Sequence, residues 1–254
     1  MNPHEDTAEE PVKPASAPRE FATTHWSLVV SAGSDSPRGR EALSELCHSY
    51  WYPLYVFVRR RVNSAHDAQD LTQAFFLHLF EKHAISRADR TRGRFRAFLL
   101  TALKHFLTNE WEKNRAGKRG GGTVPLSLDF ESGESRYQIE LTDTGLSPEK
   151  LFDRRWVLTL LDQVLGHLRN EVEESGKGPY FEALKSAILG ETTMSEYEEA
   201  GRELGISASA AKQAAYRMRN RYRQLFRAEV ARTLDDESEI DDEMRQIMEI
   251  LREN

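Results

Sequence analysis

The sequence predicts an all-α fold, with two small helical domains joined by a flexible linker. Apolar residues recur three and four positions apart in several segments, most clearly over 95–107, which is the spacing of one helix face. No segment outside the linker shows the alternation of a half-buried strand. The 254 residues, 39% hydrophobic and 30% charged, are enough for one large domain or two small ones.

Changes in composition divide the chain into five segments. These are an N-terminal extension over 1–39, a first helical domain over 40–116, a linker over 117–148, a second helical domain over 149–232 and an acidic C-terminal extension over 233–254. Residues 1–20 are polar and contain four prolines, which predicts disorder there. Glycine and proline punctuate the linker, so we expect it to be flexible.

The first domain is predicted to hold three helices. An apolar pattern over 40–61 marks the first, with Pro53 tolerated near a helix start. Ser64, followed three residues later by Asp67, predicts an N-cap for the second helix, which runs to about residue 82. A basic loop over 86–94 then leads into an amphipathic helix that opens at Phe95.

The second domain is predicted to hold four helices. The first begins near residue 149, and glycines around residue 177 end it. The second covers about 180–189. The last two are joined by a tight turn at Gly205. The chain shows no repeat with a period of 20–50 residues, so a solenoid is not expected.

Several classes of protein are excluded by what the sequence lacks. Cys47 is the one cysteine, which excludes an internal disulfide and a Cys-rich zinc site. The histidines lack metal-ligand spacing, and no phosphate-binding glycine motif or nucleophile elbow occurs. We therefore expect no enzyme activity, no cofactor and no metal. No apolar run is long enough to cross a bilayer and no secretory signal is present, so the expected location is the cytoplasm.

The net charge of −6 hides two basic blocks. Residues 90–119 hold nine Lys or Arg against two Glu, and residues 202–232 hold eight against two. The C-terminal extension, by contrast, holds nine acidic residues against two Arg. Two basic blocks in an acidic protein indicate two contact surfaces for a polyanion such as DNA. The alternative is that each block is a solvated helix face.

The second basic block begins with the pattern of a helix-turn-helix. Gly201 is small at a position where two helices must cross closely, and Gly205 permits a left-handed turn residue. Ser207 is a suitable N-cap for the second helix. Short or flexible polar residues follow at the start of that helix, where a recognition helix meets base edges. The alternative is an ordinary helical hairpin with a basic surface.

This stretch resembles region four of bacterial sigma-70 family RNA polymerase sigma factors of the extracytoplasmic-function (ECF) type. Their typical sequence is close to Tyr-x-Glu-Ile-Ala-x-x-Leu-Gly-Ile-Ser-x-Gly-Thr-Val-Lys-Ser-Arg. The residues that match are Tyr197, Glu199, Leu204, Gly205, Ile206, Ser207 and Lys212, whereas Gly201 replaces Ala and Ser209, Ala210 and Ala211 replace Gly-Thr-Val. The resemblance implies that this helix reads the minus-thirty-five promoter element through Ser207, Ala208, Ser209, Lys212, Gln213, Arg217 and Arg219.

The first domain resembles region two of the same family. Residues 66–79, His-Asp-Ala-Gln-Asp-Leu-Thr-Gln-Ala-Phe-Phe-Leu-His-Leu, are similar to the family's Asp-Ala-Glu-Asp-Leu-Val-Gln-Glu-x-Phe-Leu-x-Leu. In that family the helix docks on a coiled coil of the polymerase β′ subunit. The resemblance therefore implies a polymerase-binding face made of Asp67, Asp70 and Gln73, which lie three residues apart and share one polar face.

Residues 95–99, Phe-Arg-Ala-Phe-Leu, are similar to the Phe-Arg-Ala-Trp-Leu that opens the family's promoter-reading helix. The resemblance implies contact with the minus-ten element and its displaced single strand. The candidate residues are Arg92, Arg94, Arg96, Lys104, His105, Thr108, Asn109, Glu112 and Lys113. For His105 the alternative is a solvated helix residue. We expect Trp111 to lie in the core because of its spacing from Leu107, with a stacking role as the alternative.

Together, these resemblances imply a factor that joins the RNA polymerase core, contacting β′ and β, and directs promoter recognition and strand opening without covalent chemistry. A regulatory anti-sigma partner is left open. One alternative is a helix-turn-helix regulator that binds duplex DNA as a dimer without polymerase. Another is an RNA-binding or partner-binding helical protein. For residues 233–254 we expect an acidic amphipathic helix. Its apolar positions are Ile240, Met244, Ile247, Met248 and Leu251. We interpret it as a solvated terminal helix, or as a segment that masks a basic face or binds a regulator.

Overall fold

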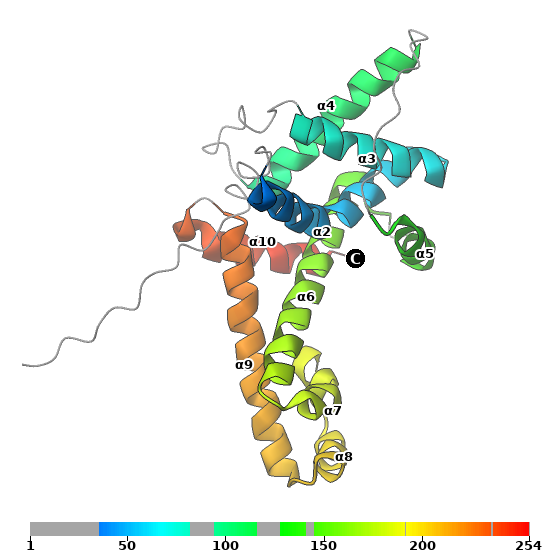
Figure 1. Cartoon of the computed structure of the whole chain (residues 1–254). Helices are drawn as coiled ribbons and strands as arrows, with labels where there is room; N and C mark the ends of the chain where they lie inside the picture. Colours follow the sequence, from blue (N-terminus) through cyan, green and yellow to red (C-terminus); the bar gives the residue numbers. More distant parts are fainter. Residues whose placement is uncertain are drawn as a thin grey trace, which may run out of the picture.

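The computed structural model describes residues 36–81, 94–115, 128–140, 145–190, 192–234 and 236–253. Throughout these ranges the regular elements are helices, with no strand, which confirms the all-α prediction (Figure 1). The disorder predicted for 1–20 and most of the basic loop, including Arg92, lie outside the described residues.

The first three described helices are α2 (Pro37–Arg59), α3 (Ala65–Glu81) and α4 (Phe95–Arg115). The Ser36 hydroxyl caps α2 by accepting a hydrogen bond of 3.0 Å from the Gly39 amide. Ser64 accepts one of 3.2 Å from the Asp67 amide, as the N-cap prediction requires. Pro53, however, lies inside α2 rather than near a helix start. The residues flanking Pro53 are fully buried, so packing outweighs the lost backbone hydrogen bond.

The predicted linker contains a helix that the sequence did not reveal. Helix α5 (Phe130–Glu140) lies against α2, with Phe130 and Tyr137 buried. The Glu134 carboxylate accepts hydrogen bonds from the Tyr55 hydroxyl and, at 3.2 Å, from Arg59 Nε. Part of the stretch expected to be a flexible linker is therefore ordered by aromatic packing and by a half-buried carboxylate.

The second helical unit comprises α6 (Pro148–Glu174), α7 (Gly178–Leu189), α8 (Met194–Leu204) and α9 (Ala208–Arg232). Helices α6 and α9 are long and run side by side in opposite directions, and α7 and α8 lie at their far end from α2 (Figure 1). At 1.5 Å per residue, the 25 residues of α9 span about 37 Å. The helix pair therefore carries α7, α8 and the start of α9 well away from the first unit.

The two helical units pack directly against each other. The apolar face of α6, which includes Phe152, Trp156 and Leu160, joins α2 in one core that also takes in Phe226 and Val230 of α9. A separate small core holds α7, α8 and the start of α9 together. The half of α6 next to α2 thus belongs to the main core, and its other half supports the helix-turn-helix.

The C-terminal extension forms a short 3₁₀ turn, η2 (Glu237–Glu239), and then α10 (Ile240–Arg252), as the amphipathic pattern predicts. The favoured interpretation as a solvated terminal helix is wrong. Ile240 and Ile247 are buried, and α10 packs on both α6 and α9. Apolar side chains on one face of α10 give this helix a place in the main core.

None of the helices in the described part of the chain combines the length and the apolar character needed to cross a membrane.

Candidate nucleic-acid interface

The turn between α8 and α9 has the geometry of a helix-turn-helix. A Cβ added to Gly201 would lie 2.8 Å from the carbonyl oxygen of Ile206, so only glycine fits there. Gly205 has a φ of +67°, the left-handed conformation that glycine adopts without strain. Both glycines therefore serve the purpose predicted from the sequence.

Both helices of this motif begin with a side-chain cap. The Thr193 hydroxyl accepts a hydrogen bond from the Glu196 amide at 3.4 Å, and the Glu196 carboxylate accepts one from the Thr193 amide at 2.6 Å. The second bond lowers the pKa of Glu196. The Ser207 hydroxyl accepts a hydrogen bond of 3.2 Å from the Ala210 amide. Ser207 thus fixes where the predicted recognition helix starts.

The first turns of α9 present an exposed polar and basic face. The predicted residues Ser209, Lys212, Gln213 and Arg217 are exposed, and Ala208 is half-buried. Tyr216, which was not predicted, is 62% exposed within this group. An exposed tyrosine one helical turn after Lys212 offers both a flat ring and a hydroxyl to a ligand. Its position four residues after Lys212, on the same helix face, is the sequence signal that could have identified it.

Arg219 does not belong to that free face. Its guanidinium donates to the carbonyl oxygens of Ala187 and, at 3.2 Å, Gly190. These carbonyls lie at the C-terminal end of α7, where backbone acceptors lack helical partners. Arg221 binds the Glu171 carboxylate of α6 at 2.6 and 2.8 Å. Arg219 and Arg221 therefore hold α9 to its neighbours, and Arg219, which is predicted as a DNA contact, caps the end of α7 in this structure.

The second half of α4 presents another exposed polar face. It carries five of the predicted residues: His105, Thr108, Asn109, Glu112 and Lys113. Trp111 is 39% exposed, so its prediction as a core residue is wrong. Leu107 faces the core, but the helix extends past the packed region by the next turn. The exposed indole next to these polar residues offers a stacking surface.

The first half of α4 is covered by acidic side chains from other helices. Arg96 is 6% exposed, and its guanidinium contacts Glu243 of α10, Asp153 of α6 at 3.3 Å and the Trp156 ring at 4.4 Å. Arg94 also contacts Glu243. Arg96, which is predicted as a DNA contact, is therefore buried and paired with acids in this conformation.

Lys104 of α4 is also paired with an acid of α6. Its ammonium lies 3.0 Å from the Glu149 carboxylate, which also binds Arg61 at 2.8 Å. The hydrogen bond from Lys104 is the main reason why the pKa of Glu149 lies below its ordinary value. For the more deeply placed pair, burial lowers the pKa of Arg96 and raises that of Asp153 despite their mutual attraction. The first half of α4 is thus held in a charge network with α6 and α10.

The predicted polymerase-binding face lies on α3. Asp67 and Asp70 are exposed, and Gln73 is half-buried. The opposite face, with Phe75 and Phe76, is buried. Asp70 forms an exposed pair with His66 at 3.2 Å. Asp67 and Asp70 therefore lie on the exposed polar face of an amphipathic helix, where a partner can reach them.

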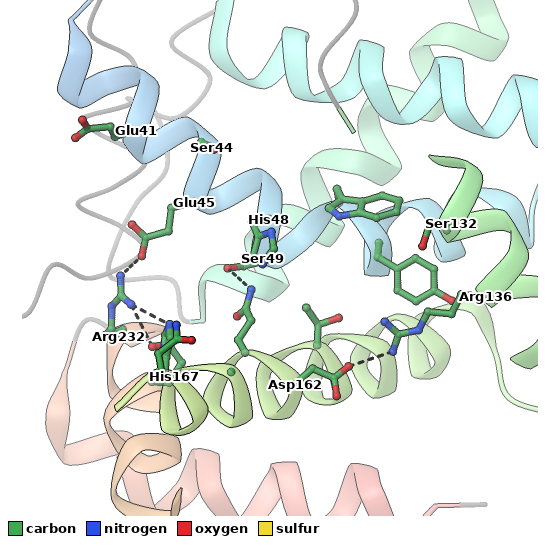
Figure 2. Close-up of a pocket in the computed structure, with 18 residues that line it drawn as sticks. Glu41, Ser44, Glu45, His48, Ser49, Ser132, Arg136, Asp162, His167 and Arg232 are labelled. Carbon is green, nitrogen blue, oxygen red and sulfur yellow. Dashed lines mark hydrogen bonds and ion pairs between the residues drawn. The ribbon is translucent and has the colours of Figure 1, made fainter. Parts of the chain in front are cut away.

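A polar cavity of about 810 Å³ lies between α2, α5, α6 and the end of α9. Figure 2 shows how side chains bridge its walls: Arg232 to Glu45, Arg136 to Asp162 at 3.5 Å, and Gln163 to Ser49 at 3.2 Å. Both arginines of its lining, Arg136 and Arg232, thus pair with an acid across the gap. The cavity is part of the boundary between the two units and lies apart from both exposed faces.

In the described ranges, no three His, Cys, Asp or Glu side chains gather as a metal ion would require. Cys47 is buried, and burial raises the pKa of its thiol to about 12, so it is held protonated.

Comparison with known proteins places one segment in a family. Residues 48–117 match the family model of Sigma-70 region 2, and the match covers about the second half of α2, all of α3 and all of α4. No curated protein and no solved structure matches the chain. The chain therefore contains a Sigma-70 region 2 domain. This match supports a relationship of that segment to the sigma-70 family.

Proposed function

We propose that this protein is an ECF-type sigma factor that joins the RNA polymerase core and directs it to promoters. One observation carries the proposal: a Sigma-70 region 2 domain and a capped helix-turn-helix with an exposed basic helix occur in the same chain. Between α4 and the second helical unit, the residues that the structure describes form the short α5, which suits the small ECF type.

In this proposal α9 reads the minus-thirty-five element. Ser209, Lys212, Gln213 and Tyr216 lie at the start of the helix, where recognition helices meet base edges in the major groove. Arg217 contacts phosphate, which contributes affinity but no sequence information. Arg219 supports the motif by capping α7.

The exposed half of α4 engages the minus-ten element. His105, Thr108 and Asn109 offer hydrogen-bonding groups to bases, and Trp111 offers a flat surface to an unstacked base. Binding energy for the opened strand offsets the cost of unpairing, so the function needs no covalent chemistry and no cofactor.

Asp67 and Asp70 on α3 bind the β′ subunit, with Gln73 at the edge of the contact, and the second helical unit contacts β. Because the polymerase and the chromosome are its partners, the factor works in the cytoplasm. An anti-sigma partner that competes with polymerase for these surfaces fits the same proposal.

The alternative is a helix-turn-helix regulator that acts without becoming a polymerase subunit. It explains the exposed face of α9 but gives no role to the exposed acids of α3 or to the second half of α4. A regulator of this kind protects a two-fold symmetric site as a dimer. A sigma factor protects two unlike elements only in the presence of polymerase.

Footprinting on a promoter fragment distinguishes the two functions. The samples are the full chain alone, core polymerase alone and the two together. We expect protection of both promoter elements only in the mixture, and loss of that protection with Asp67→Lys/Asp70→Lys. Protection of a symmetric site by the chain alone, unchanged in the double variant, would favour the regulator.

A further inference from the structure

Helix α10 places a buried acid on the basic end of α4, a surface that we define by Arg94, Arg96 and Lys104. Glu243 is 0% exposed, and its carboxylate contacts the guanidinium groups of both Arg94 and Arg96. The side-chain amide oxygen of Gln246, one turn further along α10, accepts hydrogen bonds from Arg94 and, at 3.5 Å, from Arg96. One face of α10 thus occupies two cations of the Sigma-70 region 2 domain.

Helix α6 completes the cover. Asp153 pairs with Arg96 at 3.3 Å, and Glu149 pairs with Lys104 at 3.0 Å. Each cation of the basic end of α4 therefore has an acidic partner from the second helical unit or the C-terminal extension. A DNA phosphate needs these same guanidinium and ammonium groups, because charge-assisted hydrogen bonds are how Arg and Lys bind phosphate. The acids and a DNA strand compete for one surface.

The anchoring of α10 lies on the side of the second unit. Ile240 and Ile247 are buried against the core, and Arg227 of α9 binds Asp241 at 2.6 Å. At the other end, Lys150 of α6 binds Glu253 at 3.0 Å. Toward α4, by contrast, α10 reaches out through Glu243 and Gln246. The contact of α10 with α4 is thus polar. A more highly charged ligand, such as the phosphate backbone of DNA, is suited to take the place of α10 on these cations.

We propose that α10 is an intramolecular cover: in the free chain it masks the basic end of α4, and promoter DNA engages that surface only when α10 has moved away from α4. This proposal rests on the proposed function, in which the second half of α4 binds promoter DNA, and it extends the DNA-binding surface to the basic end of α4. The free chain then has two states, with α10 packed on α4 or moved away from it. A partner shifts the balance between two states by binding one of them more tightly. Polymerase favours the state with α10 moved away if its binding separates the two helical units.

A test compares the full-length wild-type chain with Glu243→Gln. Glutamine preserves the size of the side chain but removes the charge, and Arg96 keeps Asp153 and the Trp156 ring. We expect the variant, without polymerase, to bind a promoter duplex at least about fivefold more tightly, the lower end of common coupling strengths. Glu249→Gln is the matched control, because Glu249 is exposed on the same helix and its replacement changes net charge equally. The control should bind DNA like the wild type.

A second variant acts in the opposite direction. Gln246→Glu places a carboxylate where the amide oxygen now accepts hydrogen bonds from Arg94 and Arg96. We expect it to weaken DNA binding by about threefold, because an ionised acceptor bonds more strongly than a neutral one. This variant keeps Glu243 in place, so it tests the proposal even if Glu243→Gln fails to fold, as judged by helical circular dichroism.

Hydrogen exchange supplies a direct readout of the movement. The amides of residues 240–252 should exchange faster in the complex of wild-type chain, polymerase and promoter than in the free chain. Each of four results would overturn the proposal that α10 covers α4. The first two are unchanged protection of residues 240–252 and a folded Glu243→Gln variant with wild-type affinity for DNA. The other two are equal effects of Glu243→Gln and Glu249→Gln, and no weakening of DNA binding by Gln246→Glu. If the wild-type chain with polymerase recognises no promoter, the proposed function fails instead.

Discussion

Gly201 of α8 and Ile206 of the following turn touch without a side chain between them: a Cβ on Gly201 would lie 2.8 Å from the Ile206 carbonyl oxygen. That contact sets how closely α8 approaches the start of α9. The recognition face of α9 depends on it, because the turn determines the direction in which α9 leaves α8.

Gly201→Ala should therefore destabilise the helix-turn-helix. The new methyl group meets backbone atoms that cannot rotate away, and overpacking of this kind costs about 1–3 kcal/mol. Thermal unfolding measures the loss. Gly166→Ala is the matched control, because a Cβ there meets nothing within 4 Å in the middle of α6, and it should stabilise the protein by about 0.5–1 kcal/mol. Equal stability of the two variants would contradict the tight crossing.

Arg217 and Arg221 are one helical turn apart on α9 but should differ in their effect on DNA binding. Arg217 is exposed, whereas Arg221 is bound by Glu171. Arg217→Ala should weaken promoter binding of the polymerase complex on all sequences and lower the slope of log K against log salt by about 1. Arg221→Ala should leave that slope unchanged. A titration at four or five salt concentrations checks both, and equal slopes for the two variants would remove Arg217 from the interface.

Trp111→Ala should separate function from folding. Because Trp111 is 39% exposed, its truncation should change the free energy of unfolding by less than about 1 kcal/mol. If the indole stacks on a base, binding of the polymerase complex to the single-stranded non-template minus-ten segment should weaken by about 1–3 kcal/mol. Trp111→Phe should restore part of that binding. Wild-type affinity for the single strand in Trp111→Ala would assign the minus-ten contact to other residues.

The docking of α5 should depend on pH through Glu134. Burial raises the pKa of Glu134, but hydrogen bonds from Tyr55, Gln138 and Arg59 outweigh burial, and the net pKa is below the ordinary value of 4.5. Glu134 binds fewer protons in the folded state, so its contribution is complete above about pH 4.5 and is lost as the pH falls through the lowered pKa. Hydrogen exchange of residues 130–140 in wild type and Glu134→Gln should differ at pH 6 and converge only once the pH has fallen below that lowered pKa. A constant difference would exclude Glu134 as the cause.

Local patterns predicted the helices and the turn because each depends on nearby residues. The caps at Ser64 and Ser207 and the glycine turn involve atoms a few positions apart. The exposed face of α9 follows from helical periodicity. Such features are legible without knowledge of the tertiary structure.

The misplacement of Arg96 and of the linker helix concerns contacts between distant parts of the chain. Arg96 is buried because α6 and α10 converge on it, from positions 57 and 147 residues away. Helix α5 has a weak local signal, and it is ordered by Tyr55, Arg59 and the close approach of Gly133 to Trp51. Spacing along one helix likewise cannot tell where the packed region ends, which is why Trp111 was misplaced.

Run-off transcription tests the central claim most directly. Purified core polymerase is incubated with genomic promoter fragments, with or without the full-length chain, and the transcript starts are mapped. The account predicts discrete new starts only when the chain is present, and their loss with the Asp67→Lys/Asp70→Lys variant. Starts that are identical with and without the wild-type chain would contradict it.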